Sequence, residues 1–88
     1  MFVVSESAKR RLHESLVHSD KPGIDRKCFR IERTAHEQFL TLRLVEPAPQ
    51  DATYAHEGRT VLALPRSLQT VCRDRRLRAN DKGRLVLS

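Results

Sequence analysis

Two cysteines and four histidines are the side chains of this chain that could bind a metal or act as nucleophile and base: Cys28, Cys72, His13, His18, His36 and His56. A structural zinc needs about four such ligands at short spacings, as in Cys-x-x-Cys, because the side chains must converge on one ion. No two of the six residues show such a spacing; His13 and His18, for example, would point to diverging sides of a helix. The spacing therefore predicts no metal site and no bound cofactor.

The same residues give no pattern for catalysis either. A nucleophilic cysteine needs a base beside it, and no spacing in this chain pairs Cys28 or Cys72 with one histidine rather than another. The chain has only three glycines and neither G-x-G-x-x-G nor a P-loop, so a loop that cradles a nucleotide is not expected. We therefore expect a protein that is not an enzyme, with both cysteines buried as small apolar side chains rather than joined in a disulfide.

An arginine cluster near the C-terminus is the one sequence feature that suggests a binding function. Residues 66–84 hold seven basic and two acidic side chains, which leaves a local charge of +5 within a chain of net charge +6. Guanidinium groups so close in sequence could reach several phosphates or carboxylates together, which makes nucleic acid or another polyanion a candidate partner. The competing interpretation is a solvated surface whose ion pairs contribute little. The predicted anion-binding residues are Arg73, Arg75, Arg76, Arg78 and Arg84.

The elements that would position these side chains begin with an amphipathic helix. Ser5 suits an N-cap, and Ala8, Leu12 and Leu16 follow at intervals of four residues, which places them on one face. Residues 19–23, which contain a proline and a glycine, end this helix because proline lacks the N–H that a helix interior needs.

Two β-hairpins are predicted to follow the helix. In each, apolar and polar residues alternate, as they do in strands with one buried face. Glu57 and Gly58 form the turn of the second hairpin, since glycine supplies the positive φ of a tight turn. Residues 61–64 are apolar on both faces, which indicates a central strand covered on both sides. The paired segments are 29–32 with 39–44, and 54–56 with 59–64.

The remaining segments are predicted as a loop, a short helix and a last strand. Two prolines in residues 46–51 exclude a central strand there. Pro65 suits the first turn of a second helix. A turn over residues 80–83 leads to a strand at 85–87, which is expected to close the sheet. The apolar residues at helical spacing in the second helix are Leu68, Val71 and Cys72.

Length and composition set the class of protein. With 88 residues, of which 39% are apolar and spread along the chain, one small core and one domain over residues 1–88 are expected. No apolar run approaches the roughly 20 residues of a membrane span, and the first charges follow the apolar N-terminal patch instead of preceding it. A cytoplasmic protein without membrane contact is expected. The aromatic residues have apolar neighbours and are expected in the core, not as a platform that stacks bases: Phe2, Phe29, Phe39 and Tyr54.

The order of elements and two segments resemble the HesB/IscA-like family, the A-type iron–sulfur cluster carriers. VSESAKRRLHESL near the N-terminus resembles the family's opening helix. Residues 51–68, DATYAHEGRTVLALPRSL, resemble its stretch of acidic residue, strand, glycine turn, apolar strand and Pro-x-Ser-Leu helix start. The resemblance covers nearly the whole chain. It implies an α+β fold, a compact β-sandwich of mostly antiparallel, partly mixed strands with two helices.

The family's iron–sulfur chemistry depends on three cysteines that this chain does not match. One lies in a glycine-rich loop and two in a Cys-Gly-Cys near the C-terminus, whereas the corresponding loop here reads RTAHEQ around His36 and the sequence ends at LVLS. Cys28, at the start of the preceding strand, and Cys72, in the second helix, fall elsewhere. The chain is therefore most similar to the shortened family members that lack these cysteines.

Three functions remain open from the sequence. The first is a non-catalytic HesB/IscA-like accessory or interaction protein with an unknown protein partner. The second is a polyanion- or nucleic-acid-binding module that uses the arginine cluster. The third is a role in iron–sulfur cluster assembly through an oligomer in which Cys28 or Cys72 of several subunits converge. The sequence leaves the oligomeric state open.

Overall fold

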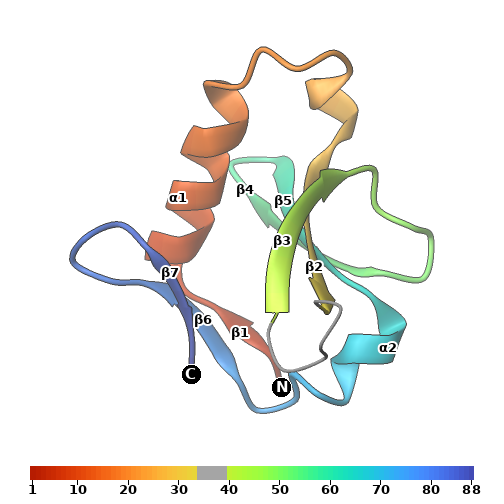
Figure 1. Ribbon diagram of the computed structural model, residues 1–88, viewed down its shortest axis with the longest axis vertical. Coiled ribbons are helices and arrows are strands. Elements are labelled where there is room, and N and C mark those ends of the chain that lie inside the picture. Colours follow the sequence, from red (N-terminus) through yellow and green to blue (C-terminus); the bar gives the residue numbers. More distant parts are fainter. Residues whose placement is uncertain (34–39) are drawn as a thin grey trace.

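The computed structural model describes residues 1–33 and 40–88 of the chain. Over these residues, two helices are combined with two mixed sheets, which confirms the α+β class (Figure 1). The helices are α1 (Glu6–Val17) and α2 (Arg66–Gln69), and Ile24–Arg26 form a short 3-10 helix, η1. The strands are β1 (Val3–Val4), β2 (Cys28–Arg33), β3 (Leu40–Val45), β4 (Ala52–His56), β5 (Arg59–Leu64), β6 (Arg76–Ala79) and β7 (Leu85–Leu87).

Helix α1 forms as its sequence predicts. Ser5 has extended backbone angles, and its Oγ accepts a hydrogen bond from the Ala8 N–H at 3.1 Å, which satisfies one of the N–H groups that the first turn leaves without a partner. Ala8, Leu12 and Leu16 are all buried on the face that packs against β4, β5 and β6. The helix thus lies against both sheets.

Replacing Ser5 with alanine should reduce the free energy of unfolding by about 1 kcal/mol, because the cap of α1 is lost while the helix remains buried. Ser15→Ala is the matched control, since the exposed Ser15 hydroxyl only donates to the Arg11 carbonyl one turn back, and alanine is the better helix former. Urea unfolding of both variants checks the prediction. Equal stability of Ser5→Ala and the parent protein would contradict the capping role.

The paired strands of both predicted hairpins are present in one four-stranded sheet with the order β3-β2-β5-β4, while the link of the first hairpin lies outside the described residues. The pairs β2–β3 and β4–β5 are antiparallel, and the two hairpins are joined by a parallel pair between β2 and β5, in which Phe29 lies opposite Leu62. Glu57 and Gly58 form the tight turn of the second hairpin, with φ angles of 51° and 79°. Strand β5 is central, and its residues 61–64 are all buried, as predicted.

The last strand does not close this sheet, which corrects the sequence prediction. It belongs to a second, three-stranded sheet with the order β1-β6-β7, in which β1 pairs with β6 in parallel and β6 with β7 antiparallel. Strand β1 has only two residues, and β6 carries one buried residue, Leu77, between arginines. Neither segment is long enough to show an alternating pattern, so the pairing of distant segments defines this sheet.

Helix α2 is shorter than expected. It begins after Pro65 as predicted, but it ends at Gln69, and a turn follows in which Val71 is 44% exposed. The Cys72 N–H still donates to the Leu68 carbonyl at 2.9 Å, so Leu68 and Cys72 are buried together. The positive φ of Asp74 (62°) then redirects the chain into β6. Only two of the three apolar residues therefore enter the core.

The core lies between α1 and the inner faces of the two sheets. Phe2, before β1, contacts Tyr54 of β4 edge to face, with ring centroids 5.6 Å apart. Phe2 is buried, while Phe29 and Tyr54 are half-buried against the core, which agrees with the prediction for these aromatic residues. Phe39 lies outside the described residues. Both termini lie at the same end of the molecule (Figure 1).

Candidate functional site

The two cysteines are buried, as predicted. Cys28 is 1% exposed and Cys72 is 0% exposed, and both are present as reduced thiols. Burial raises the pKa of the Cys28 thiol, and the negative charge of Asp51 raises it further, against a smaller opposing effect of Arg30. A protonated, inaccessible thiol is a poor nucleophile and a poor metal ligand, so Cys28 behaves as a small apolar side chain.

The structure brings together two histidines that the sequence spacing did not connect. His13 of α1 and His56 of β4 have ring centroids 5.3 Å apart, and the Glu6 carboxylate lies 3.7 Å from Nδ1 of His56. These contacts link α1 to the edge strand of the larger sheet. Within residues 1–33 and 40–88, no group of three or more histidine, cysteine or acidic side chains is arranged to hold a metal ion. His36 lies outside the described residues.

Three of the five predicted anion-binding residues lie on one face of the smaller sheet. Arg76 and Arg78 alternate with the buried Leu77, so both point to the outer face of β6. Arg84 precedes β7 and occupies the diagonal position next to Arg78, because Arg78 pairs with Val86. All three are exposed, and no carboxylate in the described part of the chain forms an ion pair with them. We call Arg76, Arg78 and Arg84 the arginine face.

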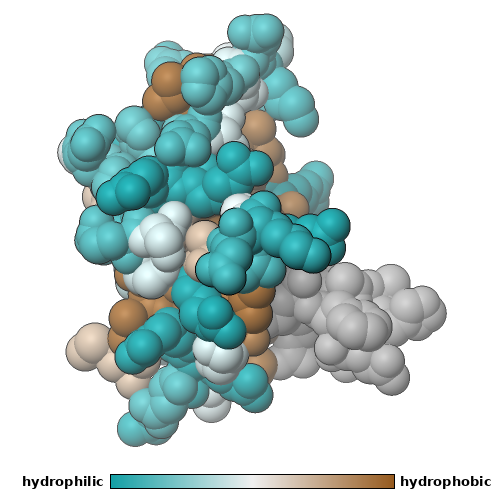
Figure 2. All heavy atoms as spheres, turned by 90° about the vertical axis from the view of Figure 1, so that its left-hand side faces the viewer, coloured by the Kyte–Doolittle hydropathy of each residue, from teal (hydrophilic) through white to brown (hydrophobic). Residues whose placement is uncertain are grey.

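Figure 2 shows the side of the molecule that carries α1 and the β6–β7 hairpin, where hydrophilic residues predominate and apolar residues appear between them.

Arg73 and Arg75 are not on the arginine face. They are exposed in the turn before β6, on either side of Asp74. The Asp74 carboxylate binds the N-terminal ammonium at 2.7 Å and so holds the start of the chain beside this turn.

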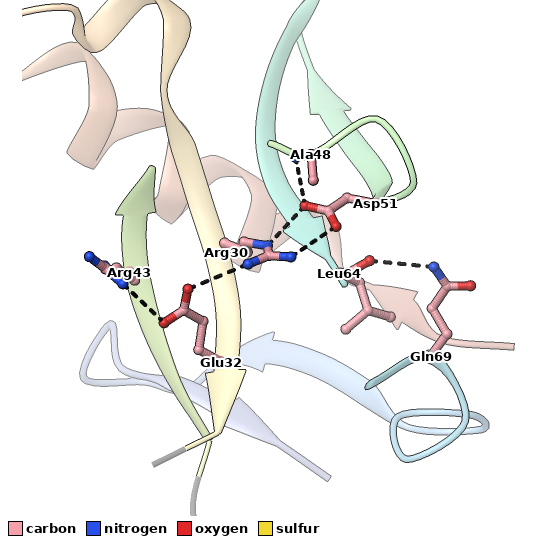
Figure 3. Close-up of polar contacts among 7 residues, drawn as sticks. All are labelled: Arg30, Glu32, Arg43, Ala48, Asp51, Leu64 and Gln69. Carbon is pink, nitrogen blue, oxygen red and sulfur yellow. Dashed lines mark hydrogen bonds and ion pairs between the residues drawn. The ribbon is translucent and has the colours of Figure 1, made fainter. Parts of the chain in front are cut away.

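A buried ion pair on the outer face of the larger sheet is a feature that the sequence did not reveal. The Asp51 side chain is 0% exposed and accepts two hydrogen bonds from Arg30, from Nε at 2.9 Å and from an Nη at 3.2 Å. It also accepts one from the Ala48 N–H at 3.0 Å, which fixes the loop of residues 46–51 (Figure 3). Arg30 also forms an ion pair with Glu32, with an N···O distance of 3.6 Å. Glu32 in turn forms an ion pair with Arg43, with an N···O distance of 3.8 Å.

These contacts determine the charge states of the pair. Burial by itself would raise the pKa of the Asp51 carboxyl, but the hydrogen bonds from Arg30 and Ala48 and the positive charge of Arg30 outweigh it, so this pKa lies below its ordinary value. The hydrogen bond to Asp51 raises the pKa of the Arg30 guanidinium. Both groups are therefore ionised at neutral pH. Together they hold the loop of residues 46–51 on the sheet.

An apolar groove separates the edge strands of the two sheets. It has a volume of about 410 Å³, and its lining residues come from β2, β3, β6 and β7. A second hollow of about 300 Å³ shares Leu42 and Leu85 with it and extends toward α1, where Arg11 and Arg84 lie at its border. The Arg11 Nε donates to the Gly83 carbonyl at 3.1 Å and so fixes the β6–β7 turn against α1. The groove is lined by Ile31, Thr41, Leu42, Leu77, Leu85 and Leu87.

No protein-family model matches the chain, and a search of curated proteins gives no match either. Among the described helices, none has the length and apolar character needed to cross a membrane.

Proposed function

We propose that this chain is a non-catalytic interaction protein of HesB/IscA-like type, without the cluster-binding cysteines, and that its partner is anionic. The observation that carries the proposal is the arginine face. Arg76, Arg78 and Arg84 are exposed on one side of the β6–β7 hairpin and have no carboxylate partner among the described residues. Each guanidinium offers five N–H donors that match a carboxylate or a phosphate in pairs.

The positions of the thiols support a role other than cluster binding. Cys28 and Cys72 are buried by different parts of the fold: Cys72 belongs to the main core, while Cys28 points to the opposite face of the larger sheet. A cluster shared through an oligomer would require a thiol at the surface. Burial of both thiols therefore favours the interaction role over iron–sulfur assembly.

Anaerobic incubation with iron and sulfide tests that preference. We expect the parent protein and the Cys28→Ala and Cys72→Ala variants to show the same absorbance after desalting. Circular dichroism establishes that the variants remain folded. A stable cluster absorbance that disappears in either variant would instead support cluster assembly and overturn the proposed role.

The arginine face makes nucleic acid a second candidate partner. Its outer surface carries Val3 and Val86 beside the arginines, and no aromatic residue of the described chain lies there. Base stacking would therefore be absent, and binding would depend on the phosphate backbone and would be independent of base sequence. The local charge of the segment favours such binding most at low salt.

Replacing Arg76, Arg78 and Arg84 together with glutamine should make binding to a polyanion less dependent on salt. For a short DNA duplex, the slope of log K against log salt should become shallower by about 2.7, because about three phosphate contacts are lost. Raising the salt from about 50 to 200 mM should therefore weaken the binding of the triple variant about 40-fold less than it weakens that of the parent protein. The control replaces Lys21, Arg26 and Arg66, which are also exposed, with glutamine. Heparin, a duplex and polyglutamate are titrated by fluorescence anisotropy. Equal losses in the two triple variants would refute a role of this face in binding anions.

A further inference from the structure

The open edge of β7 carries backbone groups that have no hydrogen-bond partner in the described fold. Arg76 and Ser88 exchange two backbone hydrogen bonds, at 3.0 and 2.9 Å, and the Asn80 N–H donates to the Arg84 carbonyl at 2.8 Å. In an antiparallel pair, hydrogen-bonded positions alternate with positions whose N–H and C=O point away from the partner strand. Leu85 and Leu87 occupy these alternate positions, opposite Ala79 and Leu77.

The hydrogen bonds on the other side of β6 support this assignment. The Leu77 carbonyl accepts from the Ser5 N–H at 2.9 Å, and the Ala79 N–H donates to the Ser7 hydroxyl at 3.5 Å, so both residues direct their backbone groups away from β7. Leu85 and Leu87 must then direct theirs to the opposite, open edge. Two N–H and two C=O groups are available there to an additional strand.

The same edge borders the apolar groove. The side chains of Leu85 and Leu87 line it together with Leu77, and Leu42 of β3 lines its other side. Strand β3 is itself the edge of the larger sheet. An extended segment bound to β7 would therefore place every second side chain in the groove, because side chains alternate along a strand. Backbone bonds and an apolar pocket together are the elements of recognition by strand addition.

The positive charges on the outer face of the smaller sheet indicate which side chains the bound segment should carry. Its outward side chains would lie beside Val86, next to Arg84 and within reach of Arg78. Acidic side chains would pair with these arginines at this position. A second copy of the chain would instead bring the same arginines, and a net charge of +6, against each other. Like charges facing each other across strands are destabilising, so charge complementarity favours a different, acidic partner.

We propose that the open edge of β7 binds an extended segment of an acidic protein in which apolar residues alternate with Asp or Glu. The apolar side chains fill the groove between β3 and β7, the acidic ones pair with Arg78 and Arg84, and the backbone bonds to Leu85 and Leu87. This proposal rests on the proposed function, because it identifies the anionic partner of the arginine face as a protein strand.

The first test uses a fluorescein-labelled, capped heptapeptide of alternating glutamate and valine. We expect saturable binding by anisotropy, and slower amide hydrogen exchange at Leu85 and Leu87 in the bound protein, measured by NMR. A peptide of the same composition, with the glutamates and valines in separate blocks, is the control for charge alone. Equal binding of both peptides, or unchanged exchange at Leu85 and Leu87, would overturn strand addition.

Two sets of variants separate backbone from charge recognition. Leu87→Pro removes the N–H that faces the open edge and leaves the β6–β7 ladder intact, so affinity should fall at least about fivefold, the effect of one hydrogen bond, relative to Leu87→Ala. The double variant Arg78→Glu/Arg84→Glu should bind the glutamate–valine peptide at least about tenfold more weakly, and it should gain binding of a lysine–valine peptide. Because both arginines are exposed, this charge exchange gives a result even where the proline variant fails to fold.

The outcomes distinguish the two proposals. Duplex DNA binding through the arginine face, without binding of the alternating peptide, would refute strand addition and leave the anionic-partner proposal standing. Dimerisation by light scattering, with protection of Leu85 and Leu87 in the absence of peptide, would identify a second copy as the occupant and also refute it. If the variant with Arg76, Arg78 and Arg84 replaced by glutamine still binds both the peptide and the polyanions as the parent protein does, both proposals are refuted.

Discussion

Replacing Asp51 with asparagine is expected to reduce the free energy of unfolding by about 3 kcal/mol, because the partly buried Arg30 guanidinium loses the carboxylate that accepts two of its hydrogen bonds and keeps only the more distant Glu32 as a counter-charge. The Asp51 side chain is 0% exposed and that of Arg30 is 26% exposed, so the loss should fall at the lower end of the range for buried pairs. The variant also weakens the bond from the Ala48 N–H that fixes the loop. Urea unfolding at neutral pH measures the change.

The control for this prediction lies in the same chain of charges. Arg43 is 69% exposed and contacts Glu32 at 3.8 Å, so Arg43→Gln should change the stability by less than about 1 kcal/mol. Both variants remove one charge from an ion pair on the same face of the sheet. Similar effects of the two substitutions would show that burial of Asp51 does not determine the strength of its contribution.

The same ion pair predicts how stability depends on pH. Because the pKa of Asp51 is lower in the folded protein than its ordinary value of 3.8, its contribution is fully present above that value. It is lost as the pH falls below 3.8 through the folded-state pKa. Unfolding measured between about pH 5 and 2 should therefore show a steeper loss for the parent protein than for Asp51→Asn. Parallel curves would contradict the shift.

The local elements could be predicted because their signals lie within a few residues. The cap at Ser5, the spacing of the apolar residues in α1 and the alternation in the two hairpins each specify one element, and all of these are present. The second sheet could not be predicted in this way. Its strands β1 and β6 are far apart in the chain, and two valines before a helix carry no periodicity.

The buried ion pair was missed for a related reason. Arg30 stands on the polar side of an alternating strand, which indicates solvent, and residues 46–51 were correctly predicted as a loop because of their prolines. Only the fold places Asp51 over Arg30. The arginine cluster was recognisable by composition, but strand geometry selects Arg76, Arg78 and Arg84 from it and leaves Arg73 and Arg75 in a turn. The open edge of β7 depends on the register with β6, which no local pattern specifies.

Replacing Leu62 with alanine should reduce the free energy of unfolding by about 2–5 kcal/mol, because the side chain is removed from the centre of the core. Leu62 is 0% exposed and lies in β5 between Phe29 of β2 and Tyr54 of β4, so neighbouring strands leave little room for the site to collapse. In a domain of this size such a loss should lower the midpoint of thermal unfolding by more than about 10 °C.

Leu42→Ala is the matched control for this substitution, since it removes the same atoms from the groove, where Leu42 is only half-buried. Leu42→Ala should reduce the free energy of unfolding by less than half as much as Leu62→Ala. It should also weaken the binding of the alternating peptide, whereas Leu62→Ala should leave the peptide affinity of the folded protein unchanged. Leu62 and Ala63 point to opposite faces of β5, and Ala63 lies opposite Arg30. The losses in Leu62→Ala and Asp51→Asn should therefore add, because the larger sheet separates the two sites. If the double variant loses markedly less stability than the two single variants lose together, the loop and the core depend on each other through β5.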